Sequence, residues 1–561
     1  MNAAVLAVIG LTMIFLGYRF YSKFIAEKIY QLDPDFVTPA HAQRDDIDYL
    51  PTNRVVLWGH HFTAVAGAAP IIGPGIAVIW GWLPAFLWVV IGTMFFAGVH
   101  DFGAVWASVR NKAKSVGSLS GDVVSPRART LFMVVVFFLL MMVNAVFGVA
   151  ISDAFQETPS SVIPAWTAVI VALIIGVLIY RMHVPILWPT VVGTVILYAV
   201  IYLGEAVPIS LSAGSFGLPV GAQWILILFL YAGIASLLPV WLLLQPRDYI
   251  NGIQLIVGLG LLYGAVLIAN PTIVAPAINP DLPASAPPIF PLLFVTIACG
   301  AISGFHGLVG SGTTSKQLNK ETDARFVGYL GSSGEGALAL VAIIAATAGF
   351  ASLADWQVMY SEFGNGGMAA FVQGGARVVA SGVGISEQFA ATLLTVMAVL
   401  FAGTTMDAGV RLQRYIVQEW GTIYDIPALQ NGYVATGMAV TACLLLAFGA
   451  GGASGEGGML IWPLFGTTNQ LLAGLTLMVI SVMLVKLGRP VRYTLIPMVF
   501  ITVAALGAAL VQLMTLYREG GILYPLLWID VAIVLLAILV MLEASSAFLR
   551  ERRAAAAGAA A

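Results

Sequence analysis

Residues 61–82, HFTAVAGAAPIIGPGIAVIWGW, decide the fold of this chain, because they are apolar enough to cross a membrane but cannot form one regular helix. A spanning helix needs about 20 apolar residues. Pro70 and Pro74 each remove a backbone donor from the stretch, and its glycines permit unwinding. A broken helix is tolerated at membrane depth only where protein buries it or where it lines a cavity. The stretch therefore predicts a discontinuous helix and favours a transporter over a simple membrane anchor.

The composition agrees with a polytopic membrane protein. The 561 residues are 60% hydrophobic and only 9% charged, whereas a soluble domain carries about 25% charged residues. The net charge of −2 gives no reason to expect a nucleic-acid partner. Cys299 and Cys443 both lie in apolar runs, so we interpret them as small core residues rather than a disulfide or a metal clip. The sequence has no P-loop, which excludes a self-contained ATP-driven pump.

The hydrophobic runs predict an all-α protein with about fifteen transmembrane spans. These are 3–22, 61–82, 83–109, 130–152, 163–180, 184–203, 222–244, 250–269, 290–315, 326–350, 388–410, 430–449, 461–485, 493–516 and 523–547. The first run could be mistaken for a signal peptide, but its positive charges follow the apolar stretch instead of preceding it. We therefore expect it to be a retained helix.

The lysines and arginines predict the orientation. If the N-terminus is outside and the spans alternate, 23 of the 25 Lys and Arg residues fall in segments on one side of the membrane. Only Arg377 and Arg518 fall on the other side. Cytoplasmic loops are the ones enriched in Lys and Arg. We therefore predict an external N-terminus and a cytoplasmic C-terminus.

Two long external segments do not look like spans. Residues 270–289 are rich in proline and carry one charge, so we expect an extended cover. Residues 351–386 contain GNGGMAAFVQGG and are too irregular to cross the membrane. We expect a re-entrant or surface helix there.

Two further breaks are predicted. The span 222–244 contains GIASLLP, which ends at Pro239, and it crosses in the direction opposite to 61–82. Discontinuous helices at matching positions of two halves point to an inverted-repeat transporter with a site at the membrane midplane. Simple packing kinks are the alternative. The span 290–315 contains GAISGFHGLVGSGTTS, whose hydroxyls suit a polar substrate or a monovalent cation, or else serve close helix packing.

Ionisable groups and imidazoles lie inside several otherwise apolar spans. The sequence places His60 and His61, His100 and Asp101, His306, and Glu335 in this way. Such residues are costly in hydrocarbon and usually mark a substrate or ion path. Asp101 and Glu335 are each about 13–15 Å from the cytoplasmic end of their helix, from 1.5 Å of rise per residue. Burial favours a neutral carboxylate, so both are candidates to carry a proton, or else structural partners of a buried donor.

The neighbours His100 and Asp101 point about 100° apart on an ideal helix, so we expect no direct contact between them. We also find no Lys or Arg deep in a predicted span. The N-termini of the half-helices near Gly67–Gly75 and Gly233–Leu238 must then supply positive potential to a substrate carboxylate.

These arguments give two predicted sets of residues. The substrate-binding set is His61, Gly67, Ala68, Gly73, Gly75, Gly233, Ser236, His306 and Ser311. The proton- or ion-coupling set is His100, Asp101, Glu335, Asp407, Thr313 and Thr314. A metal site built from the four span histidines and Asp101 is an alternative, but tight ligand spacing such as H-x-x-x-H is missing, so we predict no metal ligand and no cofactor.

Six blocks of sequence resemble one family, the carbon starvation protein (CstA) family of bacterial peptide and pyruvate transporters. The blocks are NRVVLWGHHFTAVAGAAPIIGPGIA (53–77), GVHDF (98–102), ASLLPVWLLLQPRDYI (235–250), SGFHGLVGSGTTSKQL (303–318), TTMDAGVRLQRYIVQE (404–419) and FGTTNQLLAG (465–474). The resemblance implies import of pyruvate or short peptides across the bacterial inner membrane, coupled to protons.

The resemblance also implies a LeuT-like core of five-plus-five inverted repeats, with 61–82, 222–244 and 290–315 as core helices one, six and eight. Sodium then remains a possible coupling ion, bound by Ser311, Thr313 and Thr314. The implied division is 1–60 (first span and acidic loop), 61–203 and 204–425 (the two repeats), 426–549 (further spans) and 550–561 (flexible tail).

Three hypotheses from different classes follow. The first is a secondary transporter of a small carboxylate or peptide, coupled to protons. The second is an intramembrane metal-dependent enzyme that uses the His and Asp cluster. The third is a transporter-like nutrient receptor, which would bind ligand without flux. The lipid bilayer and the small-molecule substrate are the only partners that the sequence predicts.

Overall fold

The computed structural model describes residues 1–45, 48–214, 217–452, 458–521 and 525–560. Within these ranges the regular structure is helical, apart from isolated β-bridges. Thirteen of the described helices are long and apolar enough to cross a membrane, and one bent pair brings the number to 14. The predicted all-α polytopic class is therefore confirmed. The remaining predicted span, 290–315, is cut into short helices.

The helices that can each cross a membrane are, in chain order, α1 with its continuation (Ala3–Ile29), α6 and α7 (Trp82–Arg110), α9 (Pro126–Glu157), α10 (Val162–Tyr180), α11 (Leu187–Gly204), α12 (Val220–Leu237), α13 (Leu244–Ala269), α17 (Leu330–Ala348, preceded by a π-helical turn, Arg325–Tyr329), α20 (Glu387–Ile423), α22 (Gly432–Gly451), α23 (Gly458–Lys486), α24 (Arg492–Gly520) and α25 (Pro525–Ala560). The shorter helices are α3 (Pro39–Ala42), α4 (Arg54–Val65), α5 (Ala69–Ala77), α8 (Val116–Val123), α14 (Ile289–Thr296), α15 (Gly304–Val309), α16 (Ser315–Gln317), α18 (Leu353–Met359), α19 (Gly367–Val383) and α21 (Pro427–Gln430).

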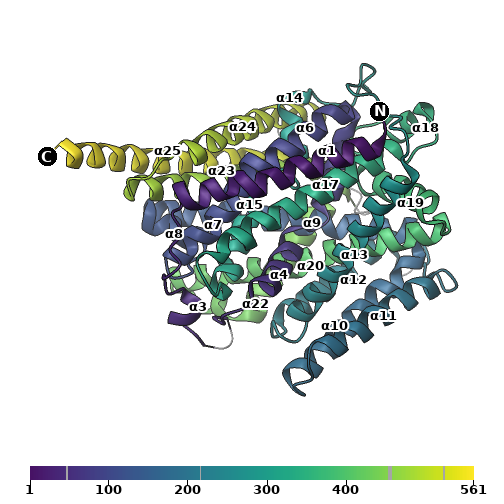
Figure 1. The fold of residues 1–561 in the computed structure, drawn as a ribbon, viewed down its shortest axis with the longest axis horizontal. Coiled ribbons are helices and arrows are strands. Elements are labelled where there is room, and N and C mark those ends of the chain that lie inside the picture. The colour runs from purple at the N-terminus through teal and green to yellow at the C-terminus, as the bar shows by residue number, and fades with distance from the viewer. Residues whose placement is uncertain (46–47, 215–216, 453–457, 522–524, 561) are drawn as a thin grey trace.

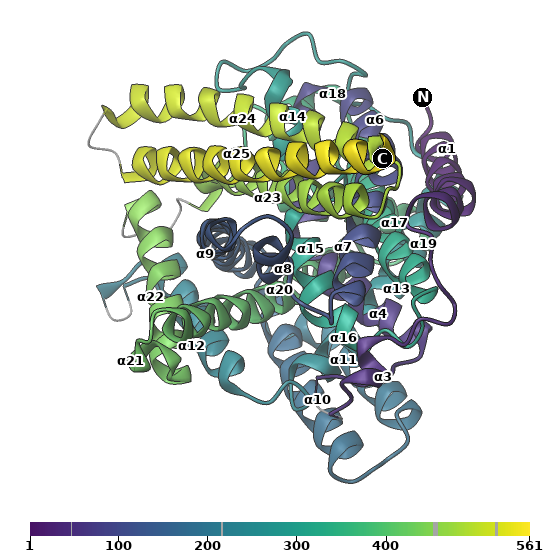
Figure 2. The ribbon, with the colours of Figure 1, turned by 90° about the vertical axis from the view of Figure 1, so that its left-hand side faces the viewer.

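The helices form a bundle with a protein-buried centre and an apolar periphery. Helix α9 is seen nearly end-on in the middle of Figure 2 and packs against α20 and α23. The apolar parts of α9, α17, α20 and α23 are largely buried, whereas those of α1, α11 and α25 are only about one third buried. Exposed apolar side chains are expected where lipid is the solvent. The candidate site must therefore lie near the central group of helices.

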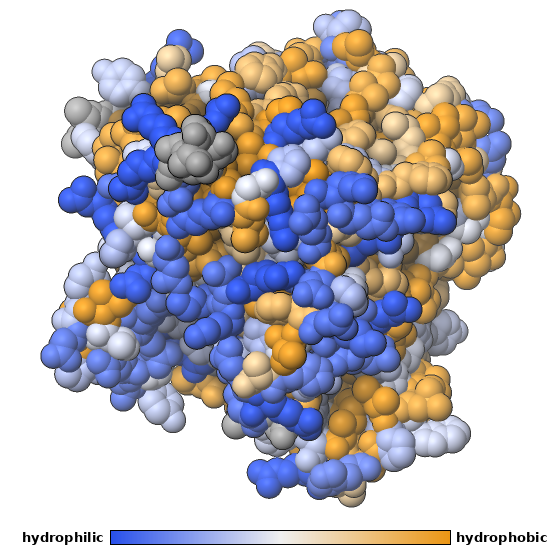
Figure 3. All heavy atoms as spheres, turned by 60° about the vertical axis from the view of Figure 1, so that its left-hand side comes forward, coloured by the Kyte–Doolittle hydropathy of each residue, from blue (hydrophilic) through white to orange (hydrophobic). Residues whose placement is uncertain are grey.

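The two termini lie at opposite ends of the molecule (Figure 1). The face seen when the C-terminal end comes forward gathers many hydrophilic residues, with apolar residues along its flank (Figure 3). This arrangement agrees with a polar end that projects from an apolar, membrane-embedded body. Opposite termini also fit an odd number of crossings.

The first predicted break is present but shorter than expected. Helices α4 and α5 are bent by 49° at a break of a few residues, Ala66–Ala68. Gly73 and Gly75 lie inside α5 and are helical, although we expected them to be unwound. Pro70 is in the first turn of α5, where its missing N–H would have had no helical partner. It therefore starts the second half-helix.

The second predicted break is wrong. Helix α12 is regular from Val220 to Leu237, and Pro239 follows its end. A proline just past the last turn stops a helix without interrupting it. The third predicted break is present. Residues 297–303 separate α14 from α15, and we call them the second break of the structure.

Neither of the two segments predicted not to span the membrane, both of which the structure describes in full, contains one of the candidate spans. Residues 270–289 form an extended cover, in which the Asn279 amide donates to the Ile79 carbonyl at 2.8 Å. The Trp80 indole N–H donates to the Pro287 carbonyl at 3.0 Å. The segment 351–386 contains α18 and α19, and α18 lies at the end of the molecule that holds the N-terminus (Figure 1). Helix α19 packs against α5, and the Tyr360 hydroxyl, just after α18, donates to the Gly75 carbonyl of α5 at 2.6 Å.

Candidate functional site

Helix α5, which follows the first break, is in direct contact with the second break, residues 297–303. A side chain on Gly300, in the second break, would meet Pro70 Cβ of α5 at 3.5 Å and Ala339 Cβ of α17 at 2.5 Å. Gly300 also has a φ of +91°, which side chains other than glycine rarely adopt. A side chain on Gly73 would lie 2.5 Å from the carbonyl oxygen of Thr296, the last residue of α14. The absence of side chains thus lets α5 and the α14–α15 break pack together at one place.

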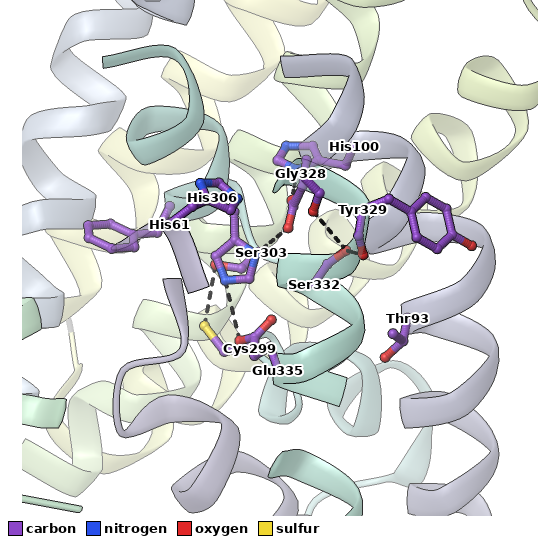
Figure 4. Close-up of polar contacts among 12 residues, drawn as sticks. His61, Thr93, His100, Cys299, Ser303, His306, Gly328, Tyr329, Ser332 and Glu335 are labelled. Atoms are coloured by element: carbon purple, nitrogen blue, oxygen red, sulfur yellow. Dashed lines mark hydrogen bonds and ion pairs between the residues drawn. The ribbon is translucent and has the colours of Figure 1, made fainter. Parts of the chain in front are cut away.

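His306 is the centre of a buried polar row. Its Nδ1 lies 2.8 Å from Asp101 Oδ2, and its Nε2 lies 3.3 Å from Glu335 Oε1. All three side chains are fully buried. Figure 4 shows His306 and Glu335 pointing toward one another beside Cys299. Residues more than 200 positions apart in the chain, on α7, α15 and α17, are therefore joined through one imidazole.

His100 extends this row at its other end. Its Nδ1 lies 2.8 Å from Asp101 Oδ1, so the prediction that the two neighbours do not touch is wrong. The 100° separation applies to the Cα–Cβ directions, but rotation about the side-chain bonds brings both groups together. Buried polar groups take the nearest partner when no water is available. The row therefore runs His100, Asp101, His306, Glu335, and we call it the polar row.

The polar row is attached to the second break. Glu335 Oε1 accepts a hydrogen bond from the backbone N–H of Gly300 at 3.0 Å. The Thr93 hydroxyl donates to the carbonyl of the same glycine at 3.1 Å. Both backbone polar groups of Gly300 are therefore held by side chains, one of them a titratable carboxylate.

His61 and His60 diverge from each other. His61 Nδ1 lies 2.8 Å from Thr314 Oγ1, and its Nε2 has no hydrogen-bond partner. His60 Nδ1 lies 3.1 Å from Asp248 Oδ2. The four span histidines and Asp101 therefore do not assemble into the metal site that we considered as an alternative.

Sequence reasoning missed Asn469, which contacts the start of the helix that carries His306. The Asn469 side chain on α23 accepts a hydrogen bond from the Phe305 N–H at 2.9 Å and donates to Ser303 Oγ at 3.0 Å. It thereby caps the start of α15, next to Cys299. The block FGTTNQLLAG contains this asparagine, but spacing within the chain gives no sign that it reaches α15.

Within the described residues, one group could hold a metal ion. Its ligand atoms, on Cys299, His306 and Glu335, lie within 4.8 Å of one another and are all buried. This group differs from the one considered in the sequence. His306 and Glu335 already contact each other, so their proximity needs no ion to explain it.

The hydroxyls of the 303–314 segment do not converge on one point. Ser311 Oγ donates to the Gly307 carbonyl at 2.6 Å and accepts from the Val116 N–H at 3.0 Å. Thr313 Oγ1 donates to the Val309 carbonyl at 2.9 Å, and Thr314 faces His61. Ser311 therefore packs toward α8 rather than lining the breaks.

Two other predicted substrate residues lie elsewhere. A side chain on Gly233 would meet Val440 of α22 at 3.4 Å. The Ser236 hydroxyl lies 3.4 Å from the Thr436 hydroxyl, also on α22. Because α12 is not broken, Gly233 and Ser236 lie at its packing surface on α22 and not at a helix break. Gly67 and Ala68, by contrast, lie at the first break.

Asp407 is not part of the polar row. It forms an ion pair with Arg247 and accepts a hydrogen bond from the Tyr231 hydroxyl at 2.8 Å. Arg247 is 4% exposed. It lies in the first turn of α13 and not deep in a span, but it is buried in the protein, where we expected a loop. We assigned this arginine to a loop, residues 245–249, between the predicted spans 222–244 and 250–269. In the structure α13 begins at Leu244, so Arg247 belongs to a helix and is buried in the bundle.

The chain matches a family model described as carbon starvation protein CstA over residues 2–358 and 351–508. A peptide transporter CstA of Campylobacter jejuni is 31% identical, over 93% of this chain and 81% of its own. The pyruvate/proton symporter BtsT of Escherichia coli is 31% identical, over 90% of this chain and 81% of its own.

Solved structures that resemble the chain include an Eremococcus coleocola manganese transporter, with 13% identity, coverage of 91% of this chain and 99% of that one, and a TM-score of 0.46. The extent of the family match and the identity to full-length relatives decide the classification. This chain belongs to the CstA family.

Proposed function

We propose that this protein is a secondary transporter that imports a small carboxylate, such as pyruvate, or short peptides, and couples the import to protons. The observation that carries the proposal is the polar row. Four fully buried groups that can exchange protons contact one another one after the next. The last of them, Glu335, accepts a hydrogen bond from the backbone of a helix break. Intramembrane groups of this kind are the usual elements of proton relays. The names of the relatives, a peptide transporter and a pyruvate/proton symporter, support the same function.

The link to Gly300 suggests how proton and substrate are coupled. An ionised Glu335 accepts the Gly300 N–H in a charge-assisted hydrogen bond, which is stronger than a neutral one. When a proton passes from Asp101 through His306 to Glu335, this bond weakens. The second break can then change conformation beside α5. In this proposal, protonation of Glu335 weakens the hydrogen bond that holds Gly300, and this loss allows the site to open.

We place the substrate between the breaks, at 66–68 and 297–303, with His61 near one side. The half-helices α5 and α15 both start at these breaks, and helix N-termini favour negative charge. Gly73 and Gly75 support the site from within α5 by allowing its close packing. The five-plus-five inverted repeat and the boundaries at 61–203 and 204–425 remain part of this proposal.

Uptake into proteoliposomes tests the function. We expect an imposed inward proton gradient to concentrate pyruvate or dialanine several-fold, while a sodium gradient of equal size does not. Protein-free liposomes and an uncoupler provide the controls. Stimulation by sodium that Thr313→Ala and Thr314→Ala abolish would establish the sodium-coupled alternative. Binding without any flux would instead indicate a receptor.

The orientation is tested by cysteine labelling in cells. We propose a bacterial inner-membrane protein with an external N-terminus and a cytoplasmic C-terminus. A cysteine at position 280 should react with an impermeant maleimide from outside, and one at position 112 only after the membrane is opened. Both positions are exposed, and the native Cys299 and Cys443 are buried. The reverse accessibility would contradict the proposed orientation.

A further inference from the structure

Helix α13 carries a stripe of buried polar side chains that is separate from the polar row. Arg247, Asn251 and Gln254 are four and three residues apart and so share one face of the helix. Each side chain is at most 4% exposed. Each also keeps an atom without a hydrogen-bond partner: Arg247 Nε, Asn251 Oδ1 and Gln254 Oε1. Buried polar atoms are nearly always paired with protein, water or a ligand, and most strictly so within a membrane.

Arg247 has hydrogen-bond partners for only part of its guanidinium group. Its Nη1 bonds Asp407 and lies 2.5 Å from the Tyr231 hydroxyl, while its Nη2 lies over Gly403 of α20, where any side chain would collide with it. Asp407 Oδ1 has no partner either. Each member of the ion pair therefore uses only part of its hydrogen-bonding capacity, and a glycine keeps the space beside the guanidinium clear.

The stripe adjoins the helices that form the first break. The Thr63 hydroxyl of α4 would be 2.8 Å from a side chain on Gly252. The Thr405 hydroxyl of α20 would be 2.7 Å from a side chain on Gly67, within the break. Helices α4, α13 and α20 thus bring the stripe and the proposed substrate position into one packed unit.

We infer that Arg247 binds the carboxylate of the transported substrate through the free Nε edge of its guanidinium, while Asp407 and Tyr231 stay on Nη1. This inference rests on the proposed function. A buried guanidinium needs an anionic partner at all times, because an unpaired buried charge is strongly unfavourable. Its planar fork fits a carboxylate in two parallel hydrogen bonds. The carboxylate can come from a small keto acid or from the C-terminus of a peptide, and Asn251 and Gln254 offer acceptors to its polar groups.

The test measures preference for a carboxylate over the matching neutral amide. Purified full-length protein is assayed for equilibrium binding of pyruvate against pyruvamide, and of dialanine against dialaninamide. We expect wild type to bind at least one acid about tenfold or more tightly than its amide, as a charge-assisted interaction implies. The double variant Arg247→Gln with Asp407→Asn removes both charges together, so neither is left unpaired. It should reduce the preference to about twofold or less.

Two further variants keep the result independent of folding. Arg377→Gln with Glu387→Gln removes a comparable pair on the surface, whose atoms are 3.1 Å apart, and should keep the full preference. Gly403→Ala leaves every charge in place but pushes on the guanidinium, and should also lower the preference. Both would be checked for a wild-type elution profile.

The outcomes are distinguishable. An acid preference in the pyruvate pair alone, or in the dialanine pair alone, identifies the source of the carboxylate. If wild type binds neither acid, the proposed function itself fails. If wild type shows the preference and both the double variant and Gly403→Ala keep it, Arg247 does not bind the carboxylate and the inference is overturned.

Discussion

Replacing Asp101 with asparagine is expected to abolish proton-driven accumulation of substrate while leaving exchange of substrate across the membrane nearly intact. In the native protein, His100 and His306 each contact one carboxylate oxygen of Asp101 at 2.8 Å. Asparagine keeps the size of this side chain but cannot pass a proton between the two histidines. Accumulation in proteoliposomes should fall by about tenfold or more, the scale on which proton-transfer groups act. Counterflow of labelled substrate measures the exchange that should persist.

Asp530→Asn is the matched control. Asp530 is also a fully buried carboxylate in a spanning helix, α25, but it has no hydrogen-bond partner and lies outside the polar row. Its replacement should leave gradient-driven accumulation close to wild type. Equal losses in both variants would mean that a buried carboxylate is needed only for folding. Normal accumulation in both Asp101→Asn and Glu335→Gln would show that the row is structural.

The members of the polar row could be found from sequence, but their connection could not. Asp101, His306 and Glu335 attract attention because each is costly inside an apolar span, and that cost does not depend on tertiary structure. Their contacts join helices separated by long stretches of chain. His306 was predicted as a substrate residue, and the structure places it between Asp101 and Glu335, two residues predicted for coupling.

The location of the second break shows a limit of local sequence signals. Pro74 lies within a half-helix and Pro239 lies after a complete one, yet both stand in apolar runs that contain glycine. Whether a proline interrupts or ends a helix depends on where the chain leaves the membrane. Ser303 and the glycines around it mark the actual break, where Asn469 of α23 supplies the cap. A cap supplied from a distant helix has no local signature.

Arg247 shows a limit of another kind. A positive charge between two apolar runs agrees with the positive-inside rule, so it was assigned to a loop. The rule concerns the average of many charges and does not place each one. Here α13 starts at Leu244, and Asp407 of α20 compensates the arginine inside the protein. Only the partner, which is 160 residues away, reveals that this arginine is buried.

Replacing Gly73 with leucine is expected to prevent α5 from packing against α14 and to destabilise the whole protein. The first carbon of any side chain there would lie 2.5 Å from the Thr296 carbonyl oxygen, far inside contact distance. That oxygen cannot easily move, because it accepts a hydrogen bond from the Trp462 indole N–H at 3.3 Å. Overpacking of this kind typically costs about 1–3 kcal/mol, and leucine adds further carbons. Thermal unfolding in detergent should show a melting temperature lower by several degrees and less monodisperse protein.

Gly260→Leu provides the matched control, because it places the same side chain on an apolar helix where nothing lies within 4 Å. Both substitutions remove a helix-interior glycine, which by itself favours the helix by roughly 0.5–1 kcal/mol. The difference between the two melting temperatures therefore isolates the contact between α5 and α14. If Gly73→Leu and Gly260→Leu had the same melting temperature, α5 would not be packed closely against the end of α14. The substrate position proposed between the two breaks would then lose its structural basis, because two half-helices act on one ligand only when their broken ends meet.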